Sequence, residues 1–487
     1  MDLQTWPFKT RPYSHQYHLI DNSWSLPEFA LHLEMGLGKS RIVIDSLAVA
    51  YMEQRLTHAL IVAPAGVYQN WYLEFDKHCP NHVPRSVYTW RRLSTKREKE
   101  AFKEFVLDED ESLKVFLINV EALSTGNGYK AAELFLRKIP GAAAMVVDES
   151  TSIKSHKAKR TKNAIKLGKL CEHRRVLSGL PNPNSPMDVY APFSFLSGNG
   201  PHLLGYENYY AFQARYCIEK LMRSGSQKSF KTVVGYRRLD ELQQRIDKHA
   251  ARLKKVDCLD LPEKIYIKRD SPLTAEQKTL YNSLKTAFLT EYKDEEISTT
   301  IMLTKLLRFQ QIITGHITTD TGKVETVPHH RIKTLLETIN EVSGKVVIWA
   351  NFRHCIQEIE AALVREYGEG SVASFYGDTT RTERVEIVRN FQNPNHDLRF
   401  LVGNPSTAGY GITLTESNTA IYYSRDFRLD NRMQSEDRIH RIGQQKANVV
   451  YIDIVSPDTI DEKIVNALRN KMELSAKVLG EVAPDWL

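Results

Sequence analysis

Cysteine is scarce in this chain: its 487 residues include only five cysteines, and no two of them stand close together. A zinc site or a disulfide framework requires cysteines at short, paired spacings, so the sequence favours neither. Scattered single thiols are typical of buried side chains in a reducing compartment. The five are Cys79, Cys171, Cys217, Cys258 and Cys355.

Long apolar runs are missing as well. No run reaches the roughly 18 residues that span a bilayer, and Met1–Pro7 lacks the apolar core of a signal peptide. We therefore expect a cytoplasmic protein with no membrane partner. Repeats and low-complexity tracts are also absent, so the sequence shows no tail for reading histones, lipids or protein partners.

Charge of one sign is not in large excess. Lysine and arginine together number 66 and aspartate and glutamate 59, which gives a net charge of +7. A net charge of this size permits a polyanionic partner but does not require one. Hydrophobic residues make up 42% and charged residues 26%, a composition typical of a folded protein, and the length suits two or three domains.

Short runs of β-branched and aliphatic residues alternate with helix-like stretches such as Gln69–His78, Glu98–Val106 and Thr382–Gln392. This alternation predicts an α/β fold with parallel sheets covered on both faces. The expected strands of the first half are His58–Ala65, Lys114–Glu121, Ala142–Glu149 and Arg174–Pro181. Those of the second half are Lys345–Phe352, Ser371–Gly377, Asp397–Asn404, Thr419–Asp426 and Asn448–Val455.

Between the two halves, the alternation of strand-like and helix-like segments is interrupted. Residues 198–256 are aromatic, basic and interrupted by glycine and serine, which we interpret as a helical insertion with an exposed turn at Arg223–Lys228. Residues 273–315 are then expected to be helical. The predicted division is a first lobe over 1–197, the insertion over 198–256, a brace and helical start of lobe two over 257–330, and a second lobe over 331–487.

Gly36-Leu37-Gly38-Lys39-Ser40 lies between an expected strand, Phe29–His32, and an expected helix, Arg41–Met52. A strand-to-helix turn presents amides and the helix dipole to phosphate. Lys39 would reach the outer phosphates and the Ser40 hydroxyl would bind Mg²⁺. The full phosphate-loop pattern has glycine where Leu33 stands, so a structural glycine turn is the alternative.

Asp148 and Glu149 end an apolar strand as adjacent carboxylates. In phosphoryl transfer one such carboxylate holds Mg²⁺ and the other polarises the attacking water, so we assign the metal to Asp148 and the water to Glu149. A solvated acidic turn is the alternative.

Arg438 and Arg441 are three residues apart, which on a helix would place both on one face, where they could neutralise one anion. Taken alone, the pair could also be a solvated basic helix end.

Together these segments resemble the Snf-family ATPases of helicase superfamily two, over nearly the whole chain. The segments of lobe one that carry the resemblance are Pro12–Gln16, Glu34–Ser40, Ile61–Pro64 with Trp71 and Glu74–Phe75, Asp148–Lys154, Ser178–Pro181 and the brace Leu253–Pro262. Those of lobe two are Phe375–Asp378 with Arg384 and Phe391, Ser406–Gly411 and Gln434–Gln444. Four residues depart from the family pattern: Ser150, Thr151, Leu180 and Tyr410.

The resemblance implies two RecA-like lobes that bind ATP with Mg²⁺. It implies that Gln16 reads the adenine and that Gly36, Leu37, Gly38, Gly409 and Gly411 contact the nucleotide. It also implies double-stranded DNA as a partner, held through its phosphates with little sequence preference. The candidate DNA contacts are Ala65, Gly66, Gln69, Asn351, Arg353 and Thr407.

The function that we expect is that of an ATP-dependent DNA translocase, a DNA-dependent ATPase whose lobes close on ATP and reopen after hydrolysis. The chain looks most like compact phage or bacterial members, which implies a role in DNA replication, recombination or repair in a bacterial or phage-infected cytoplasm. The alternatives are a strand-separating DNA or RNA helicase and a DNA clamp that binds ATP without hydrolysing it.

Overall fold

The computed structural model describes residues 3–65, 67–92, 95–224, 228–294, 299–319, 322–377, 379–408 and 412–479. The chain divides into two compact units. Unit 1 comprises the chain up to Ile218, Gly235–Asp260 and the end of the last helix from Leu474 onward. Unit 2 comprises Glu219–Val234 and Leu261–Glu473. Both contain a parallel sheet covered by helices, so the predicted fold class is confirmed.

The sheet of unit 1 has seven strands in the order β3-β4-β2-β5-β6-β1-β9, and every neighbouring pair is parallel. Its central strands are aliphatic and fully buried, as expected for strands covered on both faces. The strands are β1 (Glu28–Leu33), β2 (His58–Ala63), β3 (Arg85–Thr89), β4 (Leu113–Asn119), β5 (Ala143–Val147), β6 (His173–Leu177) and β9 (Ala250–Leu253).

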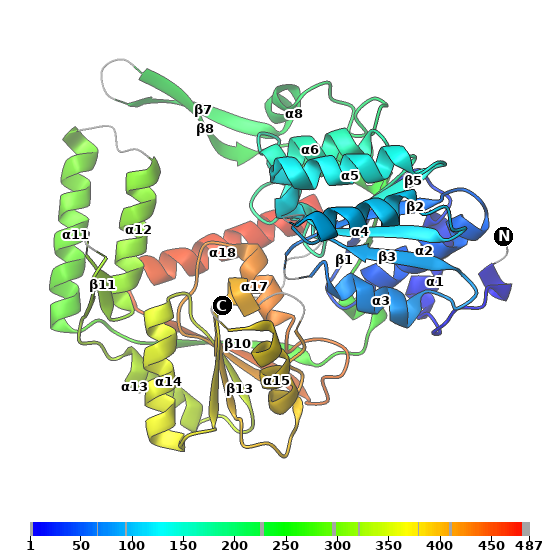
Figure 1. The fold of residues 1–487 in the computed structure, drawn as a ribbon. Coiled ribbons are helices and arrows are strands. Elements are labelled where there is room, and N and C mark those ends of the chain that lie inside the picture. Colours follow the sequence, from blue (N-terminus) through cyan, green and yellow to red (C-terminus); the bar gives the residue numbers. More distant parts are fainter. Residues whose placement is uncertain are drawn as a thin grey trace. The chain divides into compact units, whose positions relative to one another are not determined.

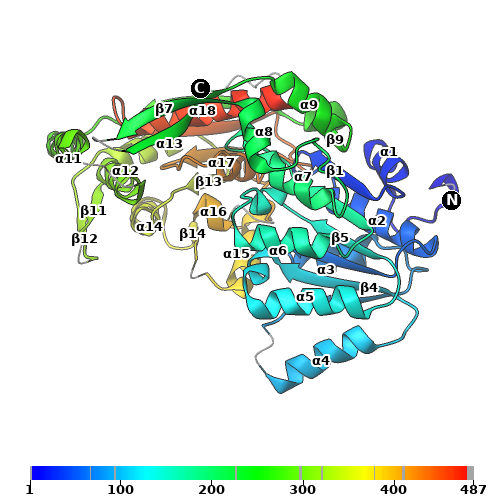
Figure 2. The ribbon, with the colours of Figure 1, turned by 90° about the horizontal axis from the view of Figure 1, so that it is seen from above.

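Helices cover both faces of this sheet. One face packs against α1, α2 and α3, whose apolar side chains join alternate strand residues in one core cluster. Helices α5, α6 and α7 lie side by side on the other face (Figure 2). The helices of unit 1 are α1 (Ser14–Ser23), α2 (Lys39–Met52), α3 (Asn70–His78), α4 (Lys96–Leu107), α5 (Gly126–Lys138), α6 (Lys159–Gly168), α7 (Tyr190–Leu196), α8 (Tyr209–Tyr216), α9 (Leu239–Asp247) and α10 (Lys255–Cys258).

The sheet of unit 2 has six parallel strands in the order β10-β17-β16-β13-β15-β14. Alternate residues of its strands face two separate core clusters, one on each side. The strands are β10 (Glu263–Asp270), β13 (Val346–Trp349), β14 (Val372–Phe375), β15 (Phe400–Gly403), β16 (Thr419–Tyr422) and β17 (Asn448–Val455), and a separate small sheet pairs β11 (His316–Thr318) with β12 (Val324–Thr326).

In unit 2, α13 and α14 pack against one core cluster and α15 against the other (Figure 1). The predicted helical segment after residue 273 is confirmed as two helices, α11 and α12. The helices of this unit are α11 (Ala275–Asp294), α12 (Thr299–Ile313), α13 (Arg331–Asn340), α14 (Arg353–Tyr367), α15 (Arg381–Gln392), α16 (Pro405–Ala408), α17 (Leu429–Glu436) and α18 (Ile460–Val478), the last of which continues into unit 1.

The segment predicted as a helical insertion, residues 198–256, contains helices α8 and α9 and also strands. The strands β7 (Cys217–Ser224) and β8 (Lys228–Tyr236) form a two-stranded sheet, and β9 closes one edge of the unit 1 sheet. The strands β7 and β8 flank the predicted exposed turn, part of which lies outside the described residues. The division into four segments, with boundaries after residues 197, 256 and 330, stays a prediction.

A network of buried charges fixes α17 on the sheet of unit 2. The guanidinium of Arg432 on α17 donates to both carboxylate oxygens of Asp453 on β17, at 2.7 and 2.9 Å, and to Glu436 at 2.7 Å. Lys264 and Tyr266 of β10 donate to the same Glu436 at 3.0 and 2.8 Å. Burial alone would raise the pKa of Asp453, but Arg432 and Arg425 hold it below its usual value. Each buried charge is therefore compensated.

We expect Asp453→Asn to lower the free energy of unfolding by about 3–5 kcal/mol, because it leaves buried guanidinium charge without its counterion. A carboxylate with a lowered pKa stabilises the fold above its unfolded pKa near 4, and this stability is lost as the pH falls through the folded pKa. The loss should therefore be complete at pH 7 and smaller in acid. Urea unfolding at pH 7 and at an acidic pH measures this loss of stability. Asp458→Asn, at an exposed position, is the matched control, and equal stability of the two variants would contradict the expectation.

Four of the five thiols, all but that of Cys258, are buried. Among the helices that the structure describes, none combines the length and the apolar character needed to cross a membrane.

Candidate active site

The loop from Gly36 to Ser40 joins β1 to the first turn of α2, as predicted. Gly36 and Gly38 have φ angles of +87° and +82°, in the left-handed region that glycine adopts without a steric penalty. Gly38 is the N-cap of α2. Because glycine has no side chain, the first-turn amides receive no side-chain cap from it. A 14-residue helix that begins in this way offers its first amides and its dipole to an anion.

The side chain of Lys39 lies over this loop. Its ammonium donates to the carbonyl oxygens of Leu33, at 2.8 Å, and of Glu34, at 3.4 Å. Both acceptors are neutral, so an anionic phosphate oxygen could replace them with a stronger, charge-assisted hydrogen bond.

Gln16 of α1 packs against the same loop. It is 4% exposed, its amide donates to the Leu37 carbonyl at 3.2 Å, and its side-chain oxygen accepts from the Tyr13 amide at 3.1 Å. A Cβ atom at Gly38 would lie 2.3 Å from the Gln16 amide nitrogen. Only glycine therefore allows Gln16 to approach the loop this closely.

Arg41, in the first turn of α2, ties down the segment that leads to Gln16. Its guanidinium donates to the carbonyl of Arg11 at 2.9 Å, to the carbonyl of Thr10, and to the buried carboxylate of Asp45 at 3.2 Å. The sequence analysis missed this role. The available signal was the i,i+4 spacing of Arg41 and Asp45, which pairs opposite charges on one helix face.

Asp148 and Glu149 follow β5, as predicted. The Asp148 carboxylate accepts the indole N–H of Trp71 at 3.0 Å and the Glu149 amide at 2.9 Å. Glu149 has a φ angle of +48°, a conformation that costs a non-glycine residue about 1 kcal/mol or more and that recurs at functional sites. Its side chain is partly exposed, whereas that of Asp148 is buried.

The electrostatics link Asp148 with Lys39. Burial raises the pKa of Asp148, while the Trp71 hydrogen bond and the Lys39 charge oppose the shift. Burial, with Arg252 and Lys39 nearby, lowers the pKa of His32 to about 3. His32 is therefore neutral at pH 7 and does not add positive charge beside Lys39.

The donor atoms at this site fit Mg²⁺. Ser40 supplies a hydroxyl and Asp148 a carboxylate, both hard oxygen ligands, and Mg²⁺ is commonly bound by one or two such groups together with phosphate oxygens and water. In the described part of the chain, no cluster of three or more His, Cys, Asp or Glu side chains could hold a metal by itself.

Arg438 and Arg441 converge on one acceptor in unit 2. Both donate to the Ile412 carbonyl, at 3.2 and 3.3 Å, and Arg438 also donates to the Gln434 carbonyl at 3.1 Å. The prediction that they lie on a helix was wrong. Helix α17 ends at Glu436, and the chain continues in turns, in which the amides of Arg438 and Ile439 donate to carbonyls three residues earlier. The Arg438 guanidinium instead binds the Gln434 carbonyl, which its own amide would bind in a longer helix.

The candidate DNA contacts fall in both units. In unit 1, Ala65 is exposed and Gln69 is the N-cap of α3. In unit 2, Asn351 follows β13, and its carbonyl accepts the Asn404 side-chain amide at 2.8 Å, while the exposed Arg353 begins α14. Thr407 lies in α16, but its side chain is outside the described part, as are Gly66, Gly409 and Gly411.

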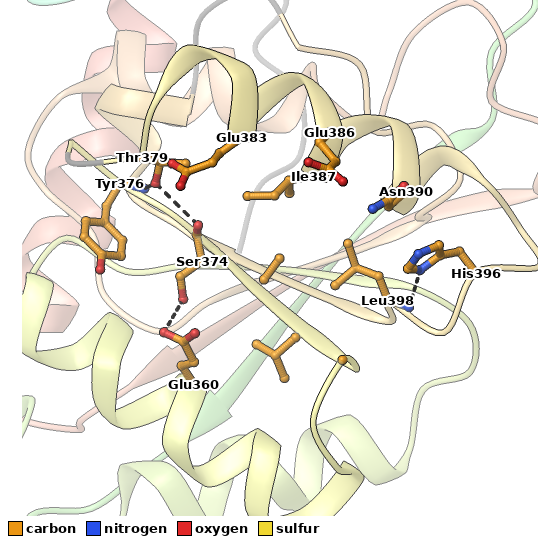
Figure 3. Close-up of a pocket in the computed structure, with 13 residues that line it drawn as sticks. Glu360, Ser374, Tyr376, Thr379, Glu383, Glu386, Ile387, Asn390, His396 and Leu398 are labelled. Carbon is orange, nitrogen blue, oxygen red and sulfur yellow. Dashed lines mark hydrogen bonds between the residues drawn. The ribbon is translucent and has the colours of Figure 1, made fainter.

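A separate cavity of about 560 Å³ opens beside β14, one of the two edge strands of the unit 2 sheet (Figure 3). Glu360 from α14 and Glu383 and Glu386 from α15 line it, and Ser374 donates to Glu360 at 2.6 Å. Three carboxylates disfavour phosphate. None of the predicted site residues lines this cavity, and its charge makes it unsuitable for a nucleotide.

Comparison with known proteins identifies the family. The pattern of the SNF2-related domain matches residues 30–316, and that of the helicase conserved C-terminal domain matches residues 330–443. An uncharacterized ATP-dependent helicase of Mycoplasma genitalium is 26% identical over 92% of this chain and 40% of its own length. A CHD3-type chromatin-remodeling factor of Arabidopsis thaliana is 23% identical over 92% of this chain and 35% of its own length.

The chain thus spans less than half the length of these relatives. Among solved structures, the Sulfolobus solfataricus SWI2/SNF2 ATPase core in complex with dsDNA is 23% identical, with a TM-score of 0.40, over 96% of this chain and 94% of that one. The SNF2-related pattern alone covers more than half of the sequence. The chain belongs to the SNF2-related family.

Proposed function

We propose that the protein is an ATP-dependent DNA translocase that hydrolyses ATP and moves along duplex DNA. The observation that carries the proposal is the loop of Lys39 at the start of α2, with the Asp148 carboxylate near enough to respond to the Lys39 charge. Membership of the SNF2-related family supports it. A role in replication, recombination or repair is the biological setting that we propose.

Each residue has a part in the proposed reaction. The first-turn amides of α2 and Lys39 bind the phosphates, and Gln16 orients the base from its place beside Gly38. Glu149 orients the attacking water and accepts its proton. Arg438 and Arg441 neutralise the negative charge that develops in the transition state.

Mg²⁺, when bound, would neutralise phosphate charge and polarise the bond that breaks. In our proposal, Ser40 and Asp148 hold it. Trp71 and the Glu149 amide restrict the Asp148 carboxylate to one orientation, which reduces the entropy lost when the ligand set forms.

DNA is the proposed track, bound through Ala65, Gly66 and Gln69 of the first unit and Asn351, Arg353 and Thr407 of the second. Contacts to phosphates carry no base identity, so affinity should be similar for unrelated duplexes. It should fall by about 10³-fold or more between 50 and 200 mM salt if some six phosphates are neutralised.

The deciding experiment measures ATP turnover with duplex, single-stranded and forked DNA and with RNA, together with displacement of a triplex-forming third strand. We expect duplex DNA to stimulate turnover most, and third-strand displacement without opening of the fork. Fork opening would instead support a strand-separating helicase. ATP binding without turnover on any nucleic acid would support a clamp, and both outcomes would reject the proposal.

A further inference from the structure

The carboxylate of Asp148 is held from two directions. The backbone amide of Glu149 binds Oδ1 at 2.9 Å, and the indole N–H of Trp71 binds Oδ2 at 3.0 Å. The first donor is the residue next to Asp148, just after β5. The second donor lies on α3, 77 residues earlier in the chain. Trp71 is 1% exposed and Asp148 7%, so water does not readily substitute for the indole.

Trp71 lies two residues after Gln69, a candidate DNA contact. The chain between β2 and α3 is a series of tight turns: the amides of Val67 and Tyr68 both donate to the Pro64 carbonyl, and that of Asn70 donates to the Val67 carbonyl. Trp71 itself belongs to the first turn of α3 and to the core cluster of unit 1. A displacement of Gln69 would therefore move the Trp71 ring with it.

The ring has little room to adjust independently. It packs in the core cluster that also holds Phe75, one turn later on α3. Asp148 is tied through its own amide to the Val62 carbonyl of β2, at 2.8 Å. A small rotation of α3 would then change the Trp71–Asp148 hydrogen bond, because the donor lies on the helix whereas the acceptor is anchored to the sheet.

We propose that Trp71 is a positioning residue that couples DNA bound at Ala65 and Gln69 to the orientation of the Asp148 carboxylate, and hence to metal-nucleotide binding. This inference rests on the proposed function, because it requires DNA to bind beside Gln69 and Mg²⁺ to bind at Asp148. Coupling of this kind is reciprocal: DNA strengthens metal-nucleotide binding by the same factor by which metal-nucleotide strengthens DNA binding.

The test uses Trp71→Phe, which retains an aromatic ring but has no N–H donor, in the full chain and without turnover. The affinity for a duplex is measured with and without Mg²⁺ and a non-hydrolysable ATP analogue. The Mg²⁺ concentration that half-saturates binding of a fluorescent ADP is measured separately. We expect a coupling factor of about five or more in the natural protein and less than about two in the variant. The half-saturating Mg²⁺ concentration should rise several-fold.

The control is Phe75→Leu, on the same helix and in the same core cluster, with no bond to Asp148. It loses packing but should retain the coupling factor of the natural protein. The inference is overturned if Trp71→Phe retains that coupling, or if Phe75→Leu loses as much of it. If the natural protein does not bind DNA, the proposed function is rejected, and the inference is rejected with it. The natural protein alone decides this point, so failure of the proposed function is distinguished from failure of the inference.

Discussion

Glu149→Gln should reduce ATP turnover by roughly a hundredfold to ten-thousandfold while leaving ATP binding nearly intact. Glutamine has almost the same shape as glutamate but cannot accept the proton of the attacking water. Two hydrogen bonds fix the backbone at Glu149. Its amide donates to the Asp148 carboxylate, and its carbonyl accepts from the Ser152 amide at 2.8 Å. The substitution therefore removes the proposed base without moving the chain. Phosphate release with saturating duplex DNA measures the loss.

Two companion variants separate chemistry from binding. Lys39→Ala should abolish turnover through lost nucleotide binding, since it removes the ammonium over the loop. Glu100→Gln makes the same charge change as Glu149→Gln on an exposed part of α4 and should turn over normally. A fluorescent nucleotide reports binding in each case. Undiminished turnover in Glu149→Gln would remove the assignment of this residue as the base.

The fold was predictable wherever strands are buried on both faces. The strands β2 and β5 are mainly aliphatic, and β4 is apolar apart from Lys114 and Asn119, so the pattern marked all three within a few residues. In the two large sheets, the strands that the analysis missed, β3, β9 and β10, all lie at the edges, and the other missed strands, β7, β8, β11 and β12, form two-stranded sheets. An edge strand is only partly covered and tolerates charged side chains, as in β10, where lysines, an arginine and acidic residues accompany two isoleucines. Such strands have no apolar run for a pattern to detect.

The site was predictable where its residues are contiguous. The glycines, Lys39 and Ser40 occupy one turn, so their local order determines their geometry. The Trp71–Asp148 bond could not be predicted in this way, because tertiary packing brings those residues together. The bond from Arg438 to the Ile412 carbonyl spans 26 residues, and it too depends on how the chain folds back. The sequence identified the arginines, but their common acceptor became visible only in the structure.

Arg441→Ala should lower the rate of ATP hydrolysis by roughly a thousandfold or more with little effect on ATP affinity. A guanidinium that acts on transition-state charge contributes to kcat far more than to ground-state binding. In the structure Arg441 donates to the Ile412 carbonyl, a neutral acceptor that a phosphate oxygen would replace favourably. Single-turnover hydrolysis, with binding followed by a fluorescent nucleotide, measures the two effects separately.

Arg441 is a cleaner test than Arg438, which is 6% exposed and whose loss would leave the carbonyls of Gln434 and Ile412 without this donor. Arg441→Lys should restore little activity, because an ammonium retains the charge but not the planar fork. Arg389→Ala removes the same charge from an exposed site on α15 and should leave turnover intact. If Arg441→Ala instead raised the KM for ATP and left kcat unchanged, the arginine would serve ground-state binding, and its proposed role in the transition state would be wrong.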